Sequence, residues 1–196
     1  YCLNCHSASL VRYNQLQQIG LSEQLIKENL LFTQDKVGGL MTIAASAKDQ
    51  REWFGAQPPD LSVIARSRGA DWLYSYLRGF YRDPARPTGW NNTVFPNVGM
   101  PNVLWQLQGI RDAESVMTKD AHGHEHAELK VSAAKGGLQS TQEFDRTIAD
   151  LTNFLVWMGE PVQLERKRVG YYVLMALGVL MLLTYLLKAA FWKDVH

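Results

Sequence analysis

The most regular pattern of apolar and polar positions lies between residues 140 and 160. Apolar side chains recur there at spacings of four, three, four and three residues: Phe144, Ile148, Leu151, Leu155 and Met158. This spacing places them on one face of an α-helix. Ser140 and Glu143 fit the capping box that begins a helix, and Gly159 followed by Pro161 fits its end. The pattern predicts an amphipathic helix over 140–160.

A second pattern lacks a polar face altogether. Val169 to Leu187 is a run of 19 residues without a charged side chain, and basic residues flank it at 166–168 and at Lys188. At ~1.5 Å per residue a helix of this length spans roughly 28 Å, about the thickness of the hydrocarbon layer. The sequence predicts a transmembrane helix at about 169–187 within a membrane anchor of residues 166–196, and a separate domain over residues 1–165.

Weaker helical patterns organise the N-terminal part. Spacings of three and four predict a helix over residues 1–18, which Gly20 ends and against which the 140–160 helix packs; its apolar face carries Leu3, His6, Leu10 and Tyr13. Residues 21–50 show only a weak helical period, broken at Gly38-Gly39.

The middle of the chain alternates between loops and short helices. Residues 51–60 are expected to be a loop, followed by a helix from Leu61 that stops at Gly69. A second helix follows, with apolar residues Trp72, Leu73, Tyr76, Leu77 and Phe80. Prolines and glycines over 81–110 exclude long regular elements. Residues 112–140 are polar and rich in Gly and Ala, and we expect an insertion loop there.

The first candidate chemistry is Cys2-Leu3-Asn4-Cys5-His6, which reads C-x-x-C-H. This is the attachment signature of a c-type haem, in which two thiols bond one edge of the haem and the histidine ligates the iron. A redox pair needs no adjacent histidine, and a zinc site needs further ligands although Cys2 and Cys5 are the only cysteines. The motif predicts one covalently bound haem c.

A haem iron bound by His6 needs a sixth ligand or an open position. Met100 lies between Gly99 and Pro101 in a proline-rich loop that can hold a thioether at a fixed distance, and Met41 is the main rival among the six methionines. The alternating histidines His122, His124 and His126 can bind metal, but nothing near them completes a coordination shell, so a solvated surface is the better interpretation.

Charge divides the chain in the same place as hydrophobicity. Overall the chain has a net charge of +1, but residues 1–165 carry 15 Lys and Arg against 18 Asp and Glu, a balance of −3. Residues 166–196 carry 5 against 1, a balance of +4. The chain begins at Tyr1 rather than Met, which is compatible with a removed export signal.

Four ordered segments, together with the haem motif and the C-terminal anchor, resemble the cytochrome c1 family, the haem subunits of quinol–cytochrome c reductase (the cytochrome bc1 complex). The segments are Pro58-Pro59-Asp60-Leu61-Ser62 with Arg66 and Arg68 following, Tyr76 to Tyr81, Phe95 to Pro101, and Trp157 to Pro161. The resemblance implies a mainly α fold: a class I-like c-type cytochrome domain with long loops and one C-terminal transmembrane helix.

The resemblance also assigns roles to residues. Cys2 and Cys5 would attach the haem, and His6 and Met100 would be the axial ligands of its iron. Arg68 would pair with a haem propionate, because a guanidinium binds a carboxylate through two hydrogen bonds. The other pocket residues would be Pro59, Leu61, Ile64, Trp72, Phe95, Val98 and Gly99. Trp72 stands where the family often has tyrosine, so a hydroxyl contact to the haem is in doubt there.

The implied function is one-electron transfer, without bond chemistry by this chain, as a subunit of the bc1 oxidoreductase in a respiratory or photosynthetic chain. Electrons would come from the Rieske iron–sulfur protein and go to a soluble or tethered c-type cytochrome. Cytochrome b and membrane lipid would be further partners, in a dimeric complex without nucleic acid. The haem domain would be periplasmic on a bacterial inner membrane, with a cytoplasmic C-terminus. Two alternatives remain: a free-standing membrane-tethered electron shuttle, and a haem sensor or gas-binding domain.

Overall fold

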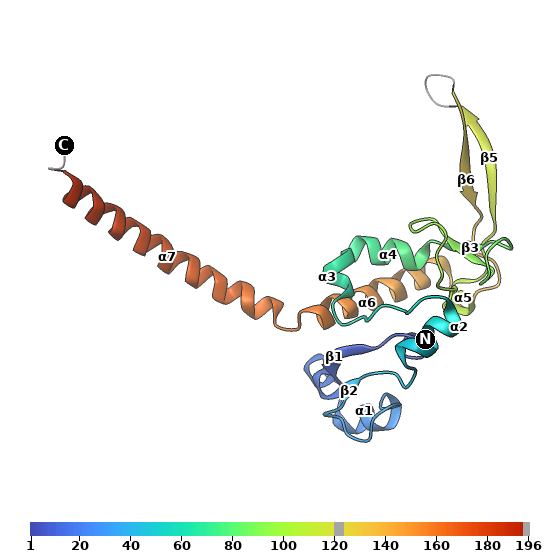
Figure 1. Ribbon diagram of the computed structural model, residues 1–196, viewed down its shortest axis with the longest axis horizontal. Coiled ribbons are helices and arrows are strands. Elements are labelled where there is room, and N and C mark those ends of the chain that lie inside the picture. The colour runs from blue at the N-terminus through green and yellow to red at the C-terminus, as the bar shows by residue number, and fades with distance from the viewer. Residues whose placement is uncertain (120–123, 194–196) are drawn as a thin grey trace. The chain divides into compact units, whose positions relative to one another are not determined.

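The computed structural model describes residues 1–119 and 124–193, and its contacts divide the chain into one unit of residues 1–159 and a second of residues 160–196. Helices contain most of the regular structure, which confirms the mainly α fold class (Figure 1). The described helices are the 3-10 helix η1 (Tyr13–Ile19), α1 (Glu23–Asn29), α2 (Ala47–Phe54), α3 (Ile64–Arg68), α4 (Ala70–Arg78), α5 (Trp105–Gln108), α6 (Thr141–Gly159) and α7 (Gln163–Trp192). The described strands are β1 (Ala8–Arg12), β2 (Leu40–Met41), β3 (Phe80–Arg82), β4 (Trp90–Asn92), β5 (Ala113–Lys119) and β6 (Glu125–Val131).

Helix α6 confirms the clearest prediction from the sequence. The backbone N–H of Ser140 donates to Glu143 Oε2 at 2.8 Å, and the backbone N–H of Glu143 donates to Ser140 Oγ at 3.4 Å, so the capping box is formed. Its buried residues follow the helical period: Phe144, Ile148, Thr152, Leu155 and Met158. This face packs against α3 and α4, which lie alongside α6 in Figure 1. Helix α6 is therefore the support for the two helices that follow the Pro-Pro-Asp-Leu-Ser segment.

Gly69 separates α3 from α4, as the sequence predicts. Its φ of +89° lies in a region that residues with a Cβ rarely adopt, so the chain can change direction there. The two helices are shorter than predicted. Helix α3 begins at Ile64 rather than Leu61, and α4 ends at Arg78 because Phe80 already pairs with Asn92 in the antiparallel ladder of β3 and β4.

The prediction of a helix over 1–18 is wrong. The haem motif forms a turn, β1 pairs antiparallel with β2, and only η1 is helical. Leu10, which the prediction places on the apolar face, is 71% exposed, whereas Ala8 and Val11 are buried. Spacing defines a helical face only where the backbone N–H groups bond one turn back, and in β1 a distant segment, residues 60–62, takes two of them.

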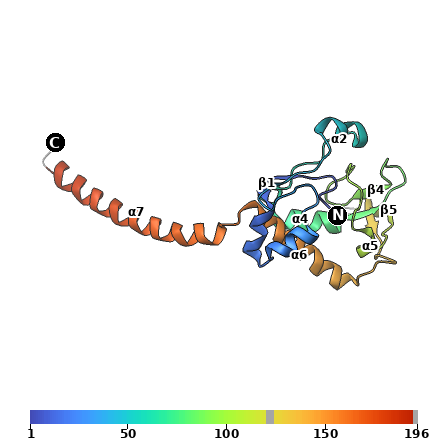
Figure 2. The ribbon, with the colours of Figure 1, turned by 90° about the horizontal axis from the view of Figure 1, so that it is seen from below.

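Residues 51–54 are helical, so the expected loop over 51–60 is also corrected in its first part. Ser46 and Asp49 form a capping box, with Ser46 Oγ accepting the Asp49 N–H at 3.2 Å and an Asp49 oxygen accepting the Ser46 N–H at 3.2 Å. This start signal carries α2 through Phe54 to Gly55, whose φ is +74°. Figure 2 shows α2 standing apart from α4 and α6.

We expect a loop over 112–140 from its polar composition, and this prediction is wrong in part. Strands β5 and β6 form an antiparallel hairpin with a continuous register from Ala113 opposite Val131 to Lys119 opposite Glu125. The apolar residues of β6, Ala127, Leu129 and Val131, recur with a period of two, whereas those of β5 do not alternate regularly. The high polar content of the segment conceals the hairpin. By contrast, 81–110 contains only β3, β4 and α5, all short, as its prolines predict.

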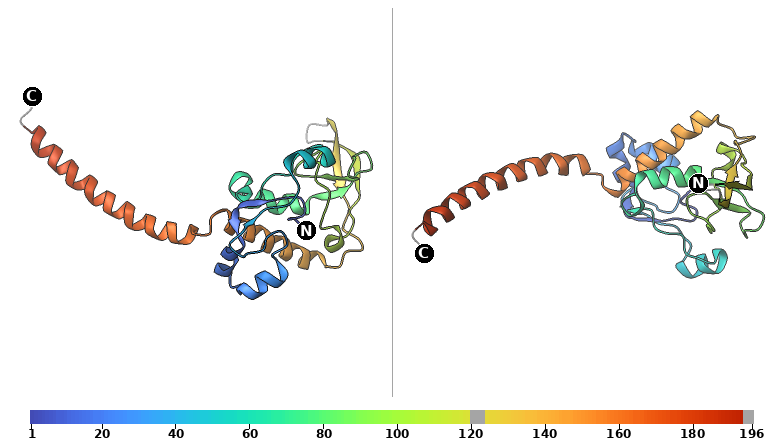
Figure 3. Two further views of the ribbon diagram at one scale, coloured as in Figure 1. Left: turned by 60° about the horizontal axis from the view of Figure 1, so that its bottom comes forward. Right: turned by 90° about the horizontal axis from the view of Figure 1, so that it is seen from above.

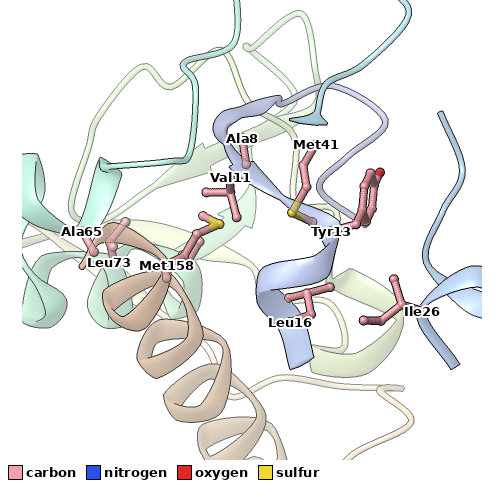
Figure 4. Packing of buried hydrophobic residues seen from close by; sticks show 10 residues of the cluster. Ala8, Val11, Tyr13, Leu16, Ile26, Met41, Ala65, Leu73 and Met158 are labelled. Carbon is pink, nitrogen blue, oxygen red and sulfur yellow. The ribbon is translucent and has the colours of Figure 1, made fainter. Parts of the chain in front are cut away.

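The largest core cluster joins segments that are distant in the chain (Figure 4). It contains Ala8, Val11, Tyr13, Leu16, Ile26, Met41, Ala65, Leu73, Leu155 and Met158. The end of α6 therefore packs against β1, η1, α3 and α4 in one apolar volume. Burial of this kind stabilises a fold by about 25 cal/mol per Å² of apolar surface removed from water.

The second unit is dominated by α7, a single continuous helix of 30 residues (Figure 3). Its length is about 45 Å at ~1.5 Å per residue, and none of its residues is buried. It is long and apolar enough to cross a membrane, and it includes the predicted span 169–187. Near its start, Arg166 forms an ion pair with Glu160.

Candidate functional site

The Cys-x-x-Cys-His motif is closed into a tight turn. The backbone N–H groups of Cys5 and His6 both donate to the Cys2 carbonyl, at 3.1 and 2.9 Å. The buried side chain of Gln50 in α2 donates through Nε2 to the Cys5 carbonyl at 2.6 Å. Both thiols are free and half-buried. The turn therefore fixes the two thiols and the imidazole relative to one another.

The pKa of the Cys2 thiol is raised because burial disfavours its charged form. The N-terminal ammonium opposes this shift, and a negative charge on Cys5 would add to it. The Cys2 thiol is thus mainly protonated at neutral pH.

The imidazole of His6 is oriented by one hydrogen bond from a distant segment. Its Nδ1 lies 2.7 Å from the Pro59 carbonyl oxygen. A carbonyl can only accept, so Nδ1 carries the proton and donates. The lone pair of the neutral ring is then on Nε2, the atom that remains for a metal. Ligand histidines are commonly fixed by such a bond to a backbone carbonyl.

Three further hydrogen bonds join the Pro-Pro-Asp-Leu-Ser segment to the chain after His6. The Leu61 N–H donates to the Ser7 carbonyl at 2.8 Å. Asp60 Oδ2 accepts from the Ser9 N–H at 2.9 Å, and Ser62 Oγ accepts from the Leu10 N–H at 3.0 Å. We call residues 59–62 the strap. Each of its residues contributes a group that holds the histidine segment in place.

The pKa of Asp60 is lowered although partial burial by itself raises it. The hydrogen bonds from Ser62 and Ser9 to the ionised carboxylate outweigh the burial effect. Its Oδ1 accepts the Ser62 N–H at 2.8 Å, so the carboxylate bonds both the strap and β1. The hydrogen bonds from Ser9 and Ser62 therefore stabilise the ionised form of the Asp60 side chain.

A group of aromatic side chains gathers around Arg68. Its guanidinium carbon lies 5.0 Å from the centroid of the Trp72 ring and 6.0 Å from that of Phe95. Trp72 stacks on Tyr76 with the two ring centroids 4.8 Å apart and 10° between their planes. The structure therefore brings together three predicted pocket residues, Arg68, Trp72 and Phe95, from α3, α4 and the loop after β4.

Met100 adjoins this aromatic group. The hydroxyl of Tyr76 donates to Met100 Sδ at 3.4 Å. Burial raises the pKa of Tyr76 to about 12, so this hydroxyl keeps its proton at physiological pH. Val98 is buried with Phe80, and Met100 packs against the same cluster. The sulfur is thus held in an apolar environment that has one directed donor.

The loop that carries Met100 is fixed by two buried asparagines. Asn92 Nδ2 donates to the Tyr76 carbonyl at 2.7 Å, and its Oδ1 accepts the Phe95 N–H at 3.2 Å. Asn91 Oδ1 accepts the Asn97 N–H at 2.8 Å. Asn97 has a φ of +62°, which asparagine tolerates better than most residues. These bonds replace regular structure in holding the loop.

The remaining predicted residues divide between the core and open positions. Leu61, Ile64 and Trp72 pack against the main core cluster, as does Leu3 of the haem motif. A Cβ added at Gly99 would meet no atom within 4 Å. Met41, the rival ligand, is 6% exposed and lies within the core, where Figure 4 places it beside Tyr13.

The alternating histidines show no metal site in the described part of the chain. His126 Nε2 lies 3.2 Å from Thr118 Oγ1, across the hairpin. His122 lies outside the described residues. Among residues 1–119 and 124–193, no group of three or more His, Cys, Asp or Glu side chains could hold a metal ion.

Sequence reasoning missed several residues that build this site. Gln50, Tyr76 and Asn92 act through partners that are 16 to 45 positions away, and Asn91 acts within a loop that has no periodicity. Tyr76 carries one available signal, since it follows Trp72 by four residues on the same helix face.

The donor set fits a covalently bound haem. Two free thiols in a C-x-x-C-H turn, an imidazole with its Nδ1 already bonded, and a thioether in an apolar setting are the groups that such a cofactor requires. An apolar macrocycle also suits the aromatic group around Arg68.

Comparison with known proteins gives the same result. The profile of the Cytochrome C1 family matches residues 1–195. Cytochrome c1 of Allochromatium vinosum is 47% identical over 100% of this chain and 80% of the relative. A protein of Nitrosomonas europaea named ammonia monooxygenase gamma subunit is 44% identical over 100% of the chain and 79% of its own length. Cytochrome c1 of Rhodospirillum rubrum is 28% identical over 99% and 77%.

Cytochrome c1 proteins are haem-containing c-type cytochromes that transfer electrons as subunits of the cytochrome bc1 complex. A match over the whole chain, with the haem motif at its start, agrees with the donor set described above. This chain belongs to the cytochrome c1 family.

Proposed function

We propose that this chain carries single electrons from the Rieske iron–sulfur protein to a soluble or tethered c-type cytochrome, within a quinol–cytochrome c reductase. The observation that supports it best is the bond from His6 Nδ1 to the Pro59 carbonyl, which leaves Nε2 for iron. An oriented imidazole opposite a thioether is the ligand pair of electron-transfer cytochromes, because it raises the potential and leaves no position open for oxygen.

In this proposal Cys2 and Cys5 attach one haem c, and His6 and Met100 are its axial ligands. When bound, the haem supplies a reversible one-electron couple. The chain's own residues orient the ligands: the strap holds His6, and Tyr76 donates to the Met100 sulfur. Burial of Met41 in the main core cluster favours Met100 as the sixth ligand.

The haem pocket in this proposal comprises Pro59, Leu61, Ile64, Arg68, Trp72, Phe95, Val98 and Gly99. Arg68 would supply the positive charge for a propionate, because a guanidinium binds a carboxylate through two hydrogen bonds. Its guanidinium lies over the rings of Trp72 and Phe95, two other pocket residues. The aromatic rings exclude water from the haem edge, which strengthens electrostatic interactions there.

We further propose that α7 anchors the chain in a bacterial inner membrane, with the haem domain periplasmic and the C-terminus cytoplasmic. The length and apolar composition of α7 support a membrane span. The flanking charges do not set the orientation, because three basic residues precede the span and two follow it. The orientation rests on the C-x-x-C-H motif, since c-type cytochromes acquire their haem outside the cytoplasm. Cytochrome b, the Rieske protein and lipid are then the partners of the chain, in a dimeric complex.

The relative named ammonia monooxygenase gamma subunit raises a second assembly in which the same haem site could transfer electrons. The subunit composition of the native complex distinguishes a quinol–cytochrome c reductase from this second assembly. The chain would be tagged, extracted in mild detergent and purified. We expect cytochrome b and a Rieske protein to co-purify with it, with haem c reduced on addition of quinol. Recovery with ammonia monooxygenase subunits, or as a free-standing cytochrome, would contradict the proposal.

A further inference from the structure

The β5–β6 hairpin has two chemically different faces. Its register and the alternation of side chains along each strand place Ala113, Ser115, Met117, Ala127, Leu129 and Val131 on one face, with Lys119 on the same face at the far end of β5. The opposite face carries Glu114, Val116, Thr118, His126, Glu128 and Lys130. On the first face, Met117 is 63% exposed and Leu129 is 46% exposed. The hairpin therefore presents an apolar face to solvent.

The outer edge of β6 is open as well. Strands β5 and β6 form a two-stranded sheet. Arg82 of β3 bridges Asp112, directly before β5, and no strand of the described residues pairs with the outer edge of β6. A two-stranded hairpin is only marginally stable in water, and an open edge is a template for a further strand. Figure 1 shows the pair extending away from the helices of its own unit. The outer edge of β6 is therefore available to a further strand.

The sequence of β6 is complementary to itself. If two copies of β6 pair antiparallel about a two-fold axis at Leu129, Leu129 faces Leu129 of the second copy and Ala127 faces Val131. Glu128 then faces Lys130 of the second copy, and the symmetry repeats that pair. Pairing about a residue keeps odd positions opposite odd positions, so the apolar face continues across the junction. Opposite charges placed directly across strands stabilise a pair.

Other registers and the other edge lack this complementarity. An axis at Glu128 places two glutamates opposite each other, and an axis at Lys130 places two lysines opposite each other, which destabilises the pair. Strand β5 paired about Val116 produces no pair of opposite charges within its described residues. Among these arrangements, only pairing of β6 about Leu129 places Glu128 opposite Lys130, and this self-complementarity favours a second copy of the chain as the occupant.

We propose that β6 pairs antiparallel with β6 of a second copy of this chain, centred on Leu129, to form a four-stranded sheet. The contact is isologous, because the same surface is used on both copies. This inference goes beyond electron transfer and does not depend on which proteins donate or accept the electron.

The first test is a cross-link in the full-length, haem-loaded chain in its native membrane. In the proposed register, Leu129→Cys places two thiols on directly opposed positions, whose Cβ atoms lie ~4.5–5.5 Å apart. Mild oxidation should give a haem-stained band of twice the chain mass on a non-reducing gel. The parent chain, which contains only Cys2 and Cys5, sets the background.

Two exposed positions serve as matched controls. Met117→Cys lies on the same apolar face but on β5, so the paired sheets hold the two copies of this position three strands apart. Leu138→Cys is 81% exposed and lies outside the hairpin, so it reports random collision. Neither should cross-link above background. Equal cross-linking at Met117 or Leu138, or none at Leu129, overturns the proposal.

The second test reverses the charges in the Leu129→Cys background. In the proposed register position 128 of one copy faces position 130 of the other. Glu128→Lys alone therefore places lysine opposite lysine, and Lys130→Glu alone places glutamate opposite glutamate. Each variant should lower the cross-linked fraction roughly tenfold. A mixture of the two variants restores both opposite-charge pairs and should restore the cross-link between unlike chains. Loss in the single variants without recovery in the mixture overturns the register. A cross-link to a different protein overturns the choice of a second copy.

Discussion

A histidine that ligates a metal needs a fixed ring and a free lone pair, and His6 obtains both from one carbonyl. Pro59 accepts the Nδ1 proton at 2.7 Å, so the ring cannot turn without breaking that bond. Tyr76 directs its hydroxyl at the sulfur of Met100, the proposed second ligand, at 3.4 Å. Both proposed ligands are therefore positioned by hydrogen bonds with other segments of the chain.

Met100→Leu is expected to keep the haem on the chain and to lower its potential. Attachment through Cys2 and Cys5 does not require the sixth ligand, whereas the soft thioether stabilises ferrous iron. The potential should fall by roughly 0.1–0.3 V, within the ~0.8 V range that axial ligands span. Redox titration measures the fall, and the reduced variant should bind carbon monoxide.

Met41→Leu is the matched control for Met100→Leu. Met41 is buried in the core, so its replacement should change stability slightly and leave the haem spectrum unchanged. If Met41→Leu removes the sulfur-to-iron charge-transfer band and Met100→Leu leaves it, the ligand assignment is wrong.

Tyr76 is expected to make stability sensitive to alkaline pH. Its pKa is raised to about 12 by burial, above the value of about 10 in an unfolded chain. Between these values the unfolded chain loses the proton and the folded chain keeps it, so Tyr76 contributes to stability below about pH 10 and loses that contribution as pH rises toward 12. The free energy of unfolding of Tyr76→Phe, measured with denaturant, should therefore fall less steeply between pH 10 and pH 12 than that of the parent. Parallel pH profiles for the two proteins would contradict the assignment.

Local chemistry made part of the site predictable from sequence. Cys2, Cys5 and His6 are adjacent, so their spacing alone carries the motif. Pro59 acts on His6 through a backbone carbonyl 53 positions away, and a carbonyl has no sequence signature. The same holds for Gln50, whose amide reaches the Cys5 carbonyl.

Among the elements, the strap has the most direct effect on the site although it is neither helix nor strand. Its side chains take backbone N–H groups of β1 that would otherwise need partners in a regular ladder. The strap thus explains why the histidine segment is extended and why α3 begins only after Ser62.

Asp60→Asn is expected to destabilise the fold by about 1–2 kcal/mol, because one amide oxygen cannot replace two carboxylate oxygens that accept from Ser9 and Ser62. The pKa of Asp60 is lowered in the folded chain, so its contribution is present above about pH 4 and is lost as pH falls through the folded value. The measurement is denaturant unfolding of parent and variant from pH 7 to pH 3.

Asp35→Asn, at an exposed loop position, is the control for Asp60→Asn and should stay within about 0.5 kcal/mol of the parent. A loss at Asp60 that persists unchanged at pH 3 would show that the carboxylate charge has no part in holding the strap.

Elements with their own capping and period were predictable, and elements set by tertiary contacts were not. Helix α6 has a capping box and five apolar residues at helical spacing, so its bounds follow from sequence. Strand β1 has a helix-like spacing, but its amides bond the strap, and tertiary structure overrides the spacing. The β5–β6 hairpin was concealed because its segment is rich in polar residues and the apolar residues of β5 do not alternate regularly.

At the scale of the whole molecule, the chain consists of two units that differ in how they bury apolar side chains. Residues 1–159 bury a core of their own, and α7 has no buried residue. None of the proposed haem ligands or pocket residues lies in the second unit.

Removal of residues 166–196 is therefore expected to release a soluble haem protein with an unchanged visible spectrum. A chain ending at Glu165 retains every proposed ligand and the whole of α6, which supports α3 and α4. The reduced-minus-oxidised spectrum of the truncated chain checks this. A lost or shifted haem band would mean that the second unit contributes to the pocket.

The central claim is that electrons reach this haem from quinol through a Rieske protein. Rapid mixing of membranes with quinol, followed at the haem c absorption band, tests it most directly when membranes with and without the Rieske protein are compared. We expect fast haem reduction in the membranes that contain the Rieske protein. Without it the haem loses its proposed electron donor, and the rate should fall at least about 100-fold, which corresponds to ~2.7 kcal/mol of barrier. Equal rates in the two membranes would contradict the account.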